Sequence, residues 1–334
     1  MNSQRKTWLF PAGLSLLTAA AFLLSIKIGA VSVSWKEVWA GLFSGGGQYR
    51  DIIVHLRLPR AILAYLVGAA LALSGAILQG YFRNPLADPF ILGVSSGASL
   101  GAVLSLELGL TWTVFGFSSQ SWLAFLTSLL LVASVYLVSE NRRLRQGESL
   151  LLTGIAAGAM ASALTSFLLF RRADAYEQAV FWLLGSFSLS GWKEVWLILP
   201  YFLLALIISE YFAPEMNLLA LGDEVAQSLG CPVRTTRRLF LFLATLLASF
   251  SVAVAGIIGF VGLIVPHSVR LIVGPDHRPL FFYSALTGGT MLVLCDLVAR
   301  TAFSPSEIPI GVITAALGAP FFIYLLNWQG QKHS

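Results

Sequence analysis

The sequence predicts an all-α integral membrane protein with about ten transmembrane helices, and three observations lead to this prediction. Only 11% of the 334 residues are charged, whereas soluble domains carry about a quarter. Apolar residues make up 57% and the mean hydropathy is +0.80. Apolar runs recur along the whole chain, and a spanning helix needs about 20 such residues. We therefore expect residues 1–334 to form a single transmembrane domain.

Nine apolar runs have the composition of spanning helices. In chain order they are Trp8–Ile28, Ala61–Tyr81, Phe90–Leu106, Trp122–Val138, Leu150–Phe170, Val195–Ile208, Leu239–Ile258, Leu280–Leu294 and Ile310–Trp328. The stretch Gly256–Val269 is rich in glycine and contains Pro266, so it either extends the preceding helix or begins a new one. Hydropathy does not decide between these. Ala179–Leu189 is too short to span and is predicted to be interfacial or re-entrant.

The first run has two interpretations. Arg5 and Lys6 precede it, as cations precede the apolar core of a signal peptide. Many more apolar runs follow, so we expect a retained first helix. In a ten-helix topology, the side of the membrane that holds the N-terminus carries slightly more cations than the opposite side. Because cytoplasmic loops are enriched in Lys and Arg, this favours cytoplasmic N- and C-termini.

Small residues inside the runs suggest close helix packing. Gly93, Gly97 and Gly101 are spaced four apart, as are Gly154 and Gly158, and such spacing lets helix backbones approach.

A faint repeat is also present. Gly75 precedes Pro85 by ten residues, and Gly256 precedes Pro266 by ten. On the predicted topology the two pairs lie on helices of opposite direction, which favours an inverted internal repeat of the kind transporters use.

Composition and motifs exclude several functions. The net charge of +5 could indicate binding to nucleic acid, but the cations lie between apolar runs and form no basic stripe. We therefore expect no nucleic-acid partner. Cys231 and Cys295 are far apart and no histidine pair has ligand spacing, so we predict no metal site and no cofactor. A Walker A loop needs a lysine after glycine. None of the five lysines (6, 27, 36, 193, 332) follows one, so ATP hydrolysis by this chain is excluded and the chain is not expected to be an enzyme.

The segment 217–230 between two predicted spans has its own character. It is predicted to form two short helices that break at Gly222, with Asp223 and Glu224 favouring the start of the second. It contains no cation between Asn217 and Val233, whereas helices lying on a bilayer carry many. A groove on a partner protein therefore fits better than the membrane surface. The candidate contact residues are Leu218, Leu221, Gly222, Asp223, Glu224, Ala226, Leu229 and Gly230.

Three stretches resemble one known family. They are the region from Leu56 to Gly101, which contains RNPLADP and the spaced glycines, then GFVGLIVPHSVRL from Gly259 to Leu271, and EIPIGVITAALGAPFFIYLL from Glu307 to Leu326. These closely resemble the FecCD-type permeases, the membrane subunits of ABC importers for iron-siderophores, haem and vitamin B12. The resemblance covers nearly the whole chain. It implies a fold like that of the vitamin B12 importer permease, in which Gly256–Val269 begins a separate helix and helices two to five repeat as seven to ten.

The resemblance also implies partners and roles. Two copies of the permease would join two ABC ATPase subunits in the inner membrane of a bacterium and receive cargo from an extracytoplasmic substrate-binding protein. Segment 217–230 would be the coupling segment that sits in the ATPase. Asn84 and Leu86 would form a cytoplasmic gate, and Arg57, Arg60 and Arg300 would dock the binding protein. The implied cargo is a ferric siderophore, with haem or cobalamin as alternatives, moved by alternating access. The resemblance leaves a homodimer and a heterodimer open.

Simpler interpretations accompany each of these roles. The Asn84–Leu86 stretch is also compatible with a plain turn, since Pro85 and Pro89 stop a helix. The three arginines are also compatible with anchors at lipid headgroups. Asp296 lies four residues before Arg300, which favours a local ion pair over the proton relay of an ion-coupled secondary transporter. A membrane protein with a structural or receptor role is the remaining rival.

Overall fold

The computed structural model describes residues 2–330 except 30, 45, 141–145, 172–175 and 189, and it describes no side chains for 2–9, 146 and 325–330. The helices in chain order are α1 Asn2–Lys27, α2 Trp35–Phe43, α3 Leu58–Tyr81 with a π-helical lead-in Ile52–Arg57, α4 Val94–Glu107 after a 3-10 turn Pro89–Leu92, α5 Ser119–Glu140, α6 Gln146–Arg171, α7 Tyr176–Leu183, α8 Trp192–Tyr211, α9 Ala213–Ala220, α10 Asp223–Ser228, α11 Val233–Ala255, α12 Val261–Val273, α13 His277–Thr301 and α14 Ile310–Gly330. A small antiparallel hairpin joins β1 Thr113–Val114 to β2 Phe117–Ser118.

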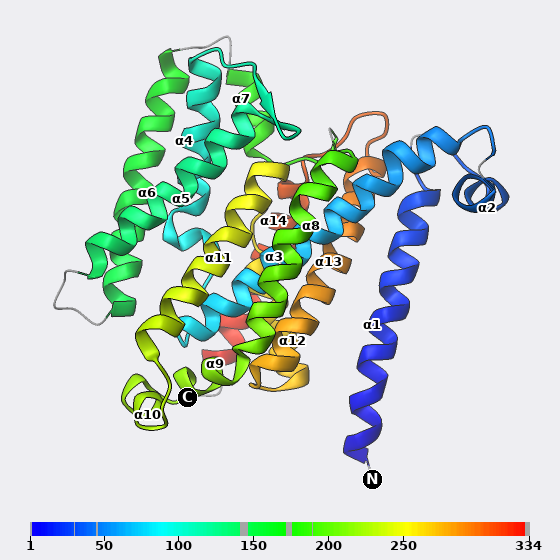
Figure 1. The fold of residues 1–334 in the computed structure, drawn as a ribbon. Helices are drawn as coiled ribbons and strands as arrows, with labels where there is room; N and C mark the ends of the chain where they lie inside the picture. Colours follow the sequence, from blue (N-terminus) through cyan, green and yellow to red (C-terminus); the bar gives the residue numbers. More distant parts are fainter. Residues whose placement is uncertain are drawn as a thin grey trace.

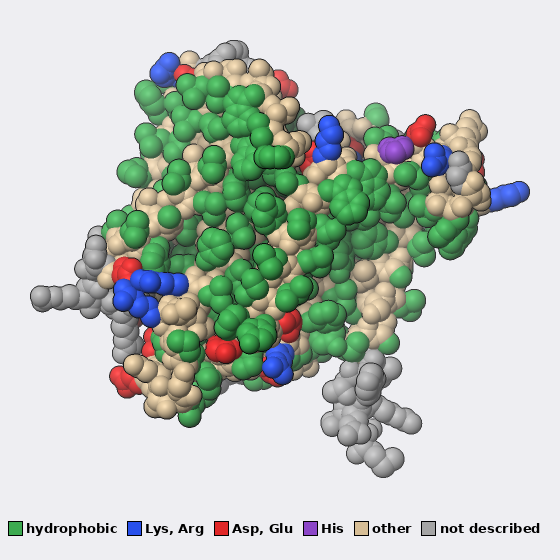
Figure 2. All heavy atoms as spheres, viewed as in Figure 1, with side chains coloured by type: hydrophobic (Ala, Val, Ile, Leu, Met, Phe, Trp, Pro, Cys, Tyr) green, Lys and Arg blue, Asp and Glu red, His purple; other side chains and the backbone are tan. Residues whose placement is uncertain are grey.

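The predicted all-α membrane fold is confirmed. Each of the ten predicted spans corresponds to a helix: α1, α3, α4, α5, α6, α8, α11, α12, α13 and α14. Within the described residues, seven of these helices are long and apolar enough to cross a bilayer, while α12 and the described part of α14 are shorter apolar helices. Figure 2 shows a broad apolar band, with charged side chains gathered toward its two ends. Neither α2 nor the hairpin was anticipated.

We name the two ends of the bundle by their elements. The α10 end carries α9 and α10, and α1 begins and α14 ends there (Figure 1). The hairpin end carries α2, the β1–β2 hairpin and α7. Short helix α2 is fixed at its start by a reciprocal capping box between Ser34 and Glu37, which satisfies backbone N–H groups that a helix start leaves free.

Helix α3 is the centre of the molecule. Over an apolar stretch of 18 residues in this helix 89% of the residues are buried, against 22% over the equivalent stretch of α6. Glycines permit this, because a Cβ at Gly75 would lie 1.8 Å from the Gly262 carbonyl oxygen of α12, and one at Gly68 would lie 2.3 Å from that of Gly288 in α13. Without side chains at these crossings the backbones approach closely. The poorly buried outer helices leave apolar faces for lipid or for another subunit.

The spaced glycines of α4 also pack helices, as predicted. A Cβ at Gly101 would lie 2.3 Å from the Leu123 carbonyl oxygen of α5, and one at Gly97 would lie 2.9 Å from the Ser128 Cα. These positions therefore hold α4 against α5.

The separate helix after α11 is present. Gly256 ends α11 at φ +73, residues 256–260 are irregular, and α12 begins at Val261 with Pro266 inside it. Irregular backbone at membrane depth requires surrounding protein or a polar cavity. Here the backbone is joined to the α7–α8 linker, where Ser186 N–H donates to Ala255 O at 2.9 Å.

The two halves of the fold share a pattern of helix lengths. The order α3, α4, α5, α6 has 24, 14, 22 and 26 residues, and α11, α12, α13, α14 has 23, 13, 25 and 21. Helices α3 and α11 run in opposite directions (Figure 1), as an inverted repeat requires. The glycine–proline spacing was the wrong evidence for it. Gly75 lies within α3 and Pro85 after it, whereas Gly256 ends α11 and Pro266 lies within α12.

Candidate functional sites

Helices α9 and α10 form the predicted pair of short helices at one end of the bundle. Helix α9 ends at Ala220, and Gly222 turns the chain with φ +120 before α10 begins at Asp223. Side-chain-bearing residues rarely adopt that φ, so glycine is required at the turn.

The apolar residues of this pair divide into two sets. Leu219 and Ala226 are buried in the bundle and Leu218 is half-buried, so these residues anchor the pair. Leu221 and Leu229 are 62% and 59% exposed, and Val225 between them is also exposed. We call these three residues the α10 patch. Glu224 and Gly230 are exposed beside it.

Asp223 fastens α10 to the rest of the bundle. Its Oδ1 accepts a hydrogen bond from Arg237 Nη2 of α11 at 2.7 Å and another from Arg83 Nη2. Burial raises the pKa of this carboxyl, but the hydrogen bonds and charges of Arg237 and Arg83 outweigh burial and lower the pKa overall. Arg83 Nε also donates to Leu219 O at 2.7 Å. Arg83 was not among the predicted site residues, yet it joins the α9–α10 pair to the turn that follows α3.

That turn contains Asn84 and Leu86. The Asn84 Oδ1 accepts from the Leu86 N–H at 2.9 Å, and the Asn84 carbonyl accepts from the Ala87 N–H at 3.1 Å. Asn84 is exposed and Leu86 is half-buried. The local geometry is that of a side-chain-stabilised turn, and Arg83 places it against α9.

Arg57 lies at the hairpin end but points inward. Its guanidinium donates to the carbonyls of Ile26 at 2.8 Å, Lys27 at 2.7 Å and Val31, and only 6% of the residue is exposed. The last carbonyls of a helix have no partner within the helix and carry partial negative charge. Arg57 therefore caps the end of α1.

Asp296 is the centre of an ion-pair network nearby. The Arg60 Nε and Nη2 both donate to its Oδ1, at 3.0 and 2.8 Å. Arg300 Nε lies 3.6 Å from its Oδ2, so the pair predicted from four-residue spacing is confirmed. Arg300 also donates to Ser25 O and, at 2.8 Å, to Ser25 Oγ, and it thereby caps α1 beside Arg57.

Glu307 completes this network from the segment before α14. It accepts from Arg60 Nη1 at 2.8 Å and from Ser188 Oγ at 2.9 Å. Burial raises the pKa of Glu307, but the hydrogen bond and charge of Arg60 outweigh it and lower the pKa overall. In the sequence, Glu307 is the first residue of the stretch Glu307–Leu326, and no role was predicted for it.

Direct contact with a docking partner requires exposed side chains, but Arg57 and Arg300 are more than nine-tenths buried. The Arg60 side chain is 13% exposed. A docking role for the three arginines stays a prediction. Arg60 differs from the other two because its guanidinium contacts Glu307, whose carboxylate is partly exposed.

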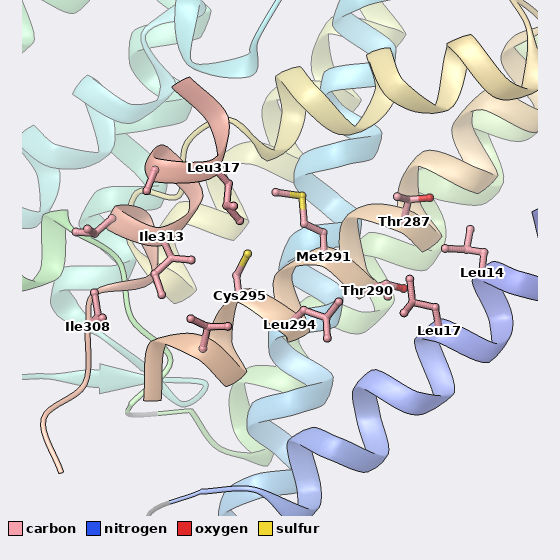
Figure 3. A pocket seen from close by; sticks show the side chains of 13 residues that line it. Leu14, Leu17, Thr287, Thr290, Met291, Leu294, Cys295, Ile308, Ile313 and Leu317 are labelled. Atoms are coloured by element: carbon pink, nitrogen blue, oxygen red, sulfur yellow. The ribbon is translucent and has the colours of Figure 1, made fainter. Parts of the chain in front are cut away.

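Two cavities accompany these sites. A mixed polar and apolar cavity of about 650 Å³, which we call the hairpin pocket, lies between the β1–β2 hairpin, the α7–α8 linker, the end of α11 and the start of α14. Its polar lining includes Ser186, Ser188, Glu194 and Glu307. The second cavity, of about 590 Å³, lies between α1, α13 and α14 (Figure 3). It is lined almost wholly by apolar side chains such as Leu17, together with the hydroxyls of Thr287 and Thr290 and the thiol of Cys295.

Comparison with known proteins places this architecture. A solved structure described as an inward-facing conformation of a metal-chelate type ABC transporter matches with a TM-score of 0.85 and 36% identity, over 96% of this chain and 99% of that one. Together with the helical bundle, this match defines the class as a membrane permease of an ABC transporter. A profile of the FecCD transport family matches residues 17–328, and the chain belongs to that family.

Named relatives transport different cargoes. The cobalamin import system permease protein BtuC of Halobacterium salinarum is 46% identical over 83% of this chain and 73% of its own length. The Fe(3+) dicitrate transport system permease protein FecD of Escherichia coli is 39% identical over 94% and 96%. The hemin transport system permease protein HmuU of Yersinia pestis is 37% identical over the full length of both. The predicted family is therefore confirmed. Its members are inner-membrane transport subunits of ABC importers, which use a separate ATPase and a substrate-binding protein.

Proposed function

We propose that this chain is the permease of a binding-protein-dependent importer that carries a metal chelate into the cytoplasm by alternating access. Two copies of the chain would join two ATPase subunits. The observation that carries the proposal is the α10 patch, because Val225 of α10 and the flanking Leu221 and Leu229 expose apolar side chains. Two arginines fasten this helix to the bundle through Asp223. An exposed apolar cluster at the water-facing end of a membrane protein suits a protein partner. The α10 end and both termini would face the cytoplasm.

Introducing a negative charge into the α10 patch tests whether this patch contacts the ATPase. Burying a leucine side chain against a partner contributes about 1.5–3 kcal/mol, so Leu221→Asp or Leu229→Asp should weaken ATPase binding at least about tenfold. Co-purification and ATP-driven uptake measure this. The matched control is Leu108→Asp, which changes a leucine of 64% exposure at the end of α4, on the hairpin end. Equal ATPase recovery from all three variants would contradict the contact.

The gate proposal concerns Asn84 and Leu86. We propose that this turn closes the cytoplasmic end of the pathway between two permease copies, since it is hydrogen-bonded through Arg83 to the α9–α10 pair. Asn84→Cys in both copies should cross-link in one nucleotide state and separate in another. Ser228→Cys, at an exposed position of α10, serves as the control. If Asn84→Cys cross-links to the same extent in every nucleotide state, the gate is refuted and the stretch is only a turn.

A second copy of the chain would cover part of the apolar surface. Exposed apolar side chains on α6 and α14, among them Ile155, Phe167, Leu317 and Ile323, support this proposal. Native mass spectrometry of the purified complex with its ATPase should give two identical permease chains, and a single permease copy or two different ones would refute the homodimer.

For docking of the binding protein, we propose Arg60 as the principal contact, with Arg57 and Arg300 holding the end of α1 beside it. Charge contacts at a surface weaken with salt, so the affinity should fall as ionic strength rises. Arg60→Gln should reduce both the affinity and its salt dependence.

The proposed cargo is a ferric siderophore, on the breadth of iron-chelate transport in this family. A corrinoid is the second candidate, and the 46% identity with a cobalamin permease supports it. Uptake of labelled siderophore, haem and cobalamin by cells that lack their own importers and express this chain with its partners separates the three.

A further inference from the structure

The guanidinium of Arg60 binds two carboxylates of its own chain. Asp296 accepts from Nε and Nη2, and Glu307 accepts from Nη1 at 2.8 Å and from Nη2 at 3.0 Å. A guanidinium offers two edges from which paired N–H groups bind a carboxylate. Both edges are occupied here. A carboxylate of a docking partner therefore binds Arg60 in this way only after one of the two internal acids has left.

The two acids differ in how easily they leave. Asp296 is 1% exposed and also lies against Arg300, whereas the Glu307 side chain is 37% exposed. Removing one partner of a buried ion pair is strongly unfavourable, while an exposed pair contributes little. Asp296 is thus the fixed partner of Arg60, and Glu307 is the exchangeable one.

Glu307 also forms part of the wall of the hairpin pocket. Its carboxylate binds Ser188 of the α7–α8 linker at 2.9 Å, and both residues line the pocket. Close by, the Ile310 N–H donates to Gly185 O at 3.1 Å, so the start of α14 is also attached to that linker. Glu307 therefore ties α3, through Arg60, to the two segments that close one side of the pocket.

We propose that Glu307 is an internal competitor for the docking carboxylate, and that a partner acid which displaces it from Arg60 releases the wall of the hairpin pocket. The occupant is an acidic surface residue of the substrate-binding protein. This inference rests on the proposed docking at Arg60. It makes docking and opening of the hairpin pocket a single exchange of one carboxylate for another.

The first test measures the affinity of the purified binding protein for the permease–ATPase complex in nanodiscs. Glu307→Gln removes the competing charge and should tighten binding about two- to fivefold, the range expected for loss of a partly exposed ion pair. The matched control is Glu194→Gln. Glu194 lines the same pocket but accepts from the Gly191 N–H, so this variant should bind as the wild type does. Arg60→Gln should weaken binding.

The second test follows the pocket wall directly. Ile308→Cys places a thiol beside Glu307 at a half-buried position of the pocket. Cys231 and Cys295 are buried, and replacing both by alanine gives a clean background. Labelling by a membrane-impermeant maleimide should accelerate when the binding protein docks. In the Glu307→Gln background it should be fast without the partner.

The outcomes separate the inference from the docking proposal. If Arg60→Gln weakens binding while Glu307→Gln leaves it unchanged, docking at Arg60 stands and the competition is refuted. If Glu307→Gln tightens binding without faster labelling, the competition stands and the release of the pocket wall is refuted. If Arg60→Gln leaves the affinity unchanged, docking at Arg60 is refuted and the exchange falls with it. Melting temperatures of Glu307→Gln and Glu194→Gln near that of the wild type show that folding is retained. Arg60→Gln removes a partner of buried Asp296 and should melt lower, so its affinity is measured well below its own Tm.

Discussion

Replacing Asp296 by Asn probes the buried ion-pair network most sharply. Asp296 and Glu307 together balance Arg60 and Arg300, so the four side chains sum to zero charge, and the substitution leaves a net positive charge. Asp296 is 1% exposed and the Arg300 side chain is 6% exposed. Removing one partner of such a buried pair costs about 3–5 kcal/mol. Removing Glu307, which is 37% exposed, costs roughly 0–1 kcal/mol.

Thermal unfolding of the purified subunit in detergent measures this difference. For a chain of this size a loss of 1 kcal/mol lowers Tm by roughly 2 °C, so Asp296→Asn should melt about 6–10 °C below the wild type. Glu307→Gln should lie within about 2 °C of it, and Glu194→Gln should not change.

A double variant provides the internal check. Asp296→Asn combined with Arg300→Met restores charge balance, because Glu307 remains with Arg60. It should recover part of the lost Tm, although the cap on Ser25 is lost. If Asp296→Asn melts within about 2 °C of Glu194→Gln, the network does not stabilise the hairpin end and the reasoning is refuted.

Three other predictions concern single positions. Gly75→Ala should abolish accumulation in the membrane, because its Cβ would overlap the α12 backbone at 1.8 Å, while Gly13→Ala, with nothing within 4 Å, should express normally; equal immunoblot levels would refute the close crossing. Burial raises the pKa of Asp88 to about 6, above its unfolded value, so ionisation between pH 4 and 6 costs stability; Asp88→Asn should raise Tm at pH 7.5 and not at pH 4, and an equal rise at both would refute this. Arg83→Gln should speed hydrogen exchange in α9–α10 by less than about tenfold, since Arg83 and Asp223 are both partly exposed; unchanged exchange would show that this bridge does not fasten the pair.

Much of the fold is readable from the sequence because lipid imposes a simple rule on composition. A spanning segment must be apolar and helical, so the apolar runs located nine of the ten helices, and Gly222 located the break between α9 and α10. The separate start of α12 could not be derived from hydropathy. It depends on the φ of Gly256 and on hydrogen bonds to the α7–α8 linker, which lies far away in the sequence.

The functional side chains were harder to interpret, because a sequence shows charge but not burial. The four-residue spacing predicted the ion pair between Asp296 and Arg300. The stronger partner of Asp296 is Arg60, 236 residues away, and Asp223 is joined to Arg83 across 140 residues. Such contacts arise only when α3 packs at the centre of the bundle. The same packing buries Arg57 and Arg300, for which the sequence suggested contact with a docking partner or with lipid headgroups.

Uptake into proteoliposomes tests the central claim most directly. The purified chain is reconstituted with its ATPase and with the binding protein on the loading side, and accumulation of a labelled ferric siderophore or cobalamin is measured. We predict accumulation that requires ATP, the binding protein and intact Leu221 and Leu229. Accumulation by the chain alone, driven by a proton or sodium gradient, would contradict the assignment as an importer permease and would favour an ion-coupled carrier.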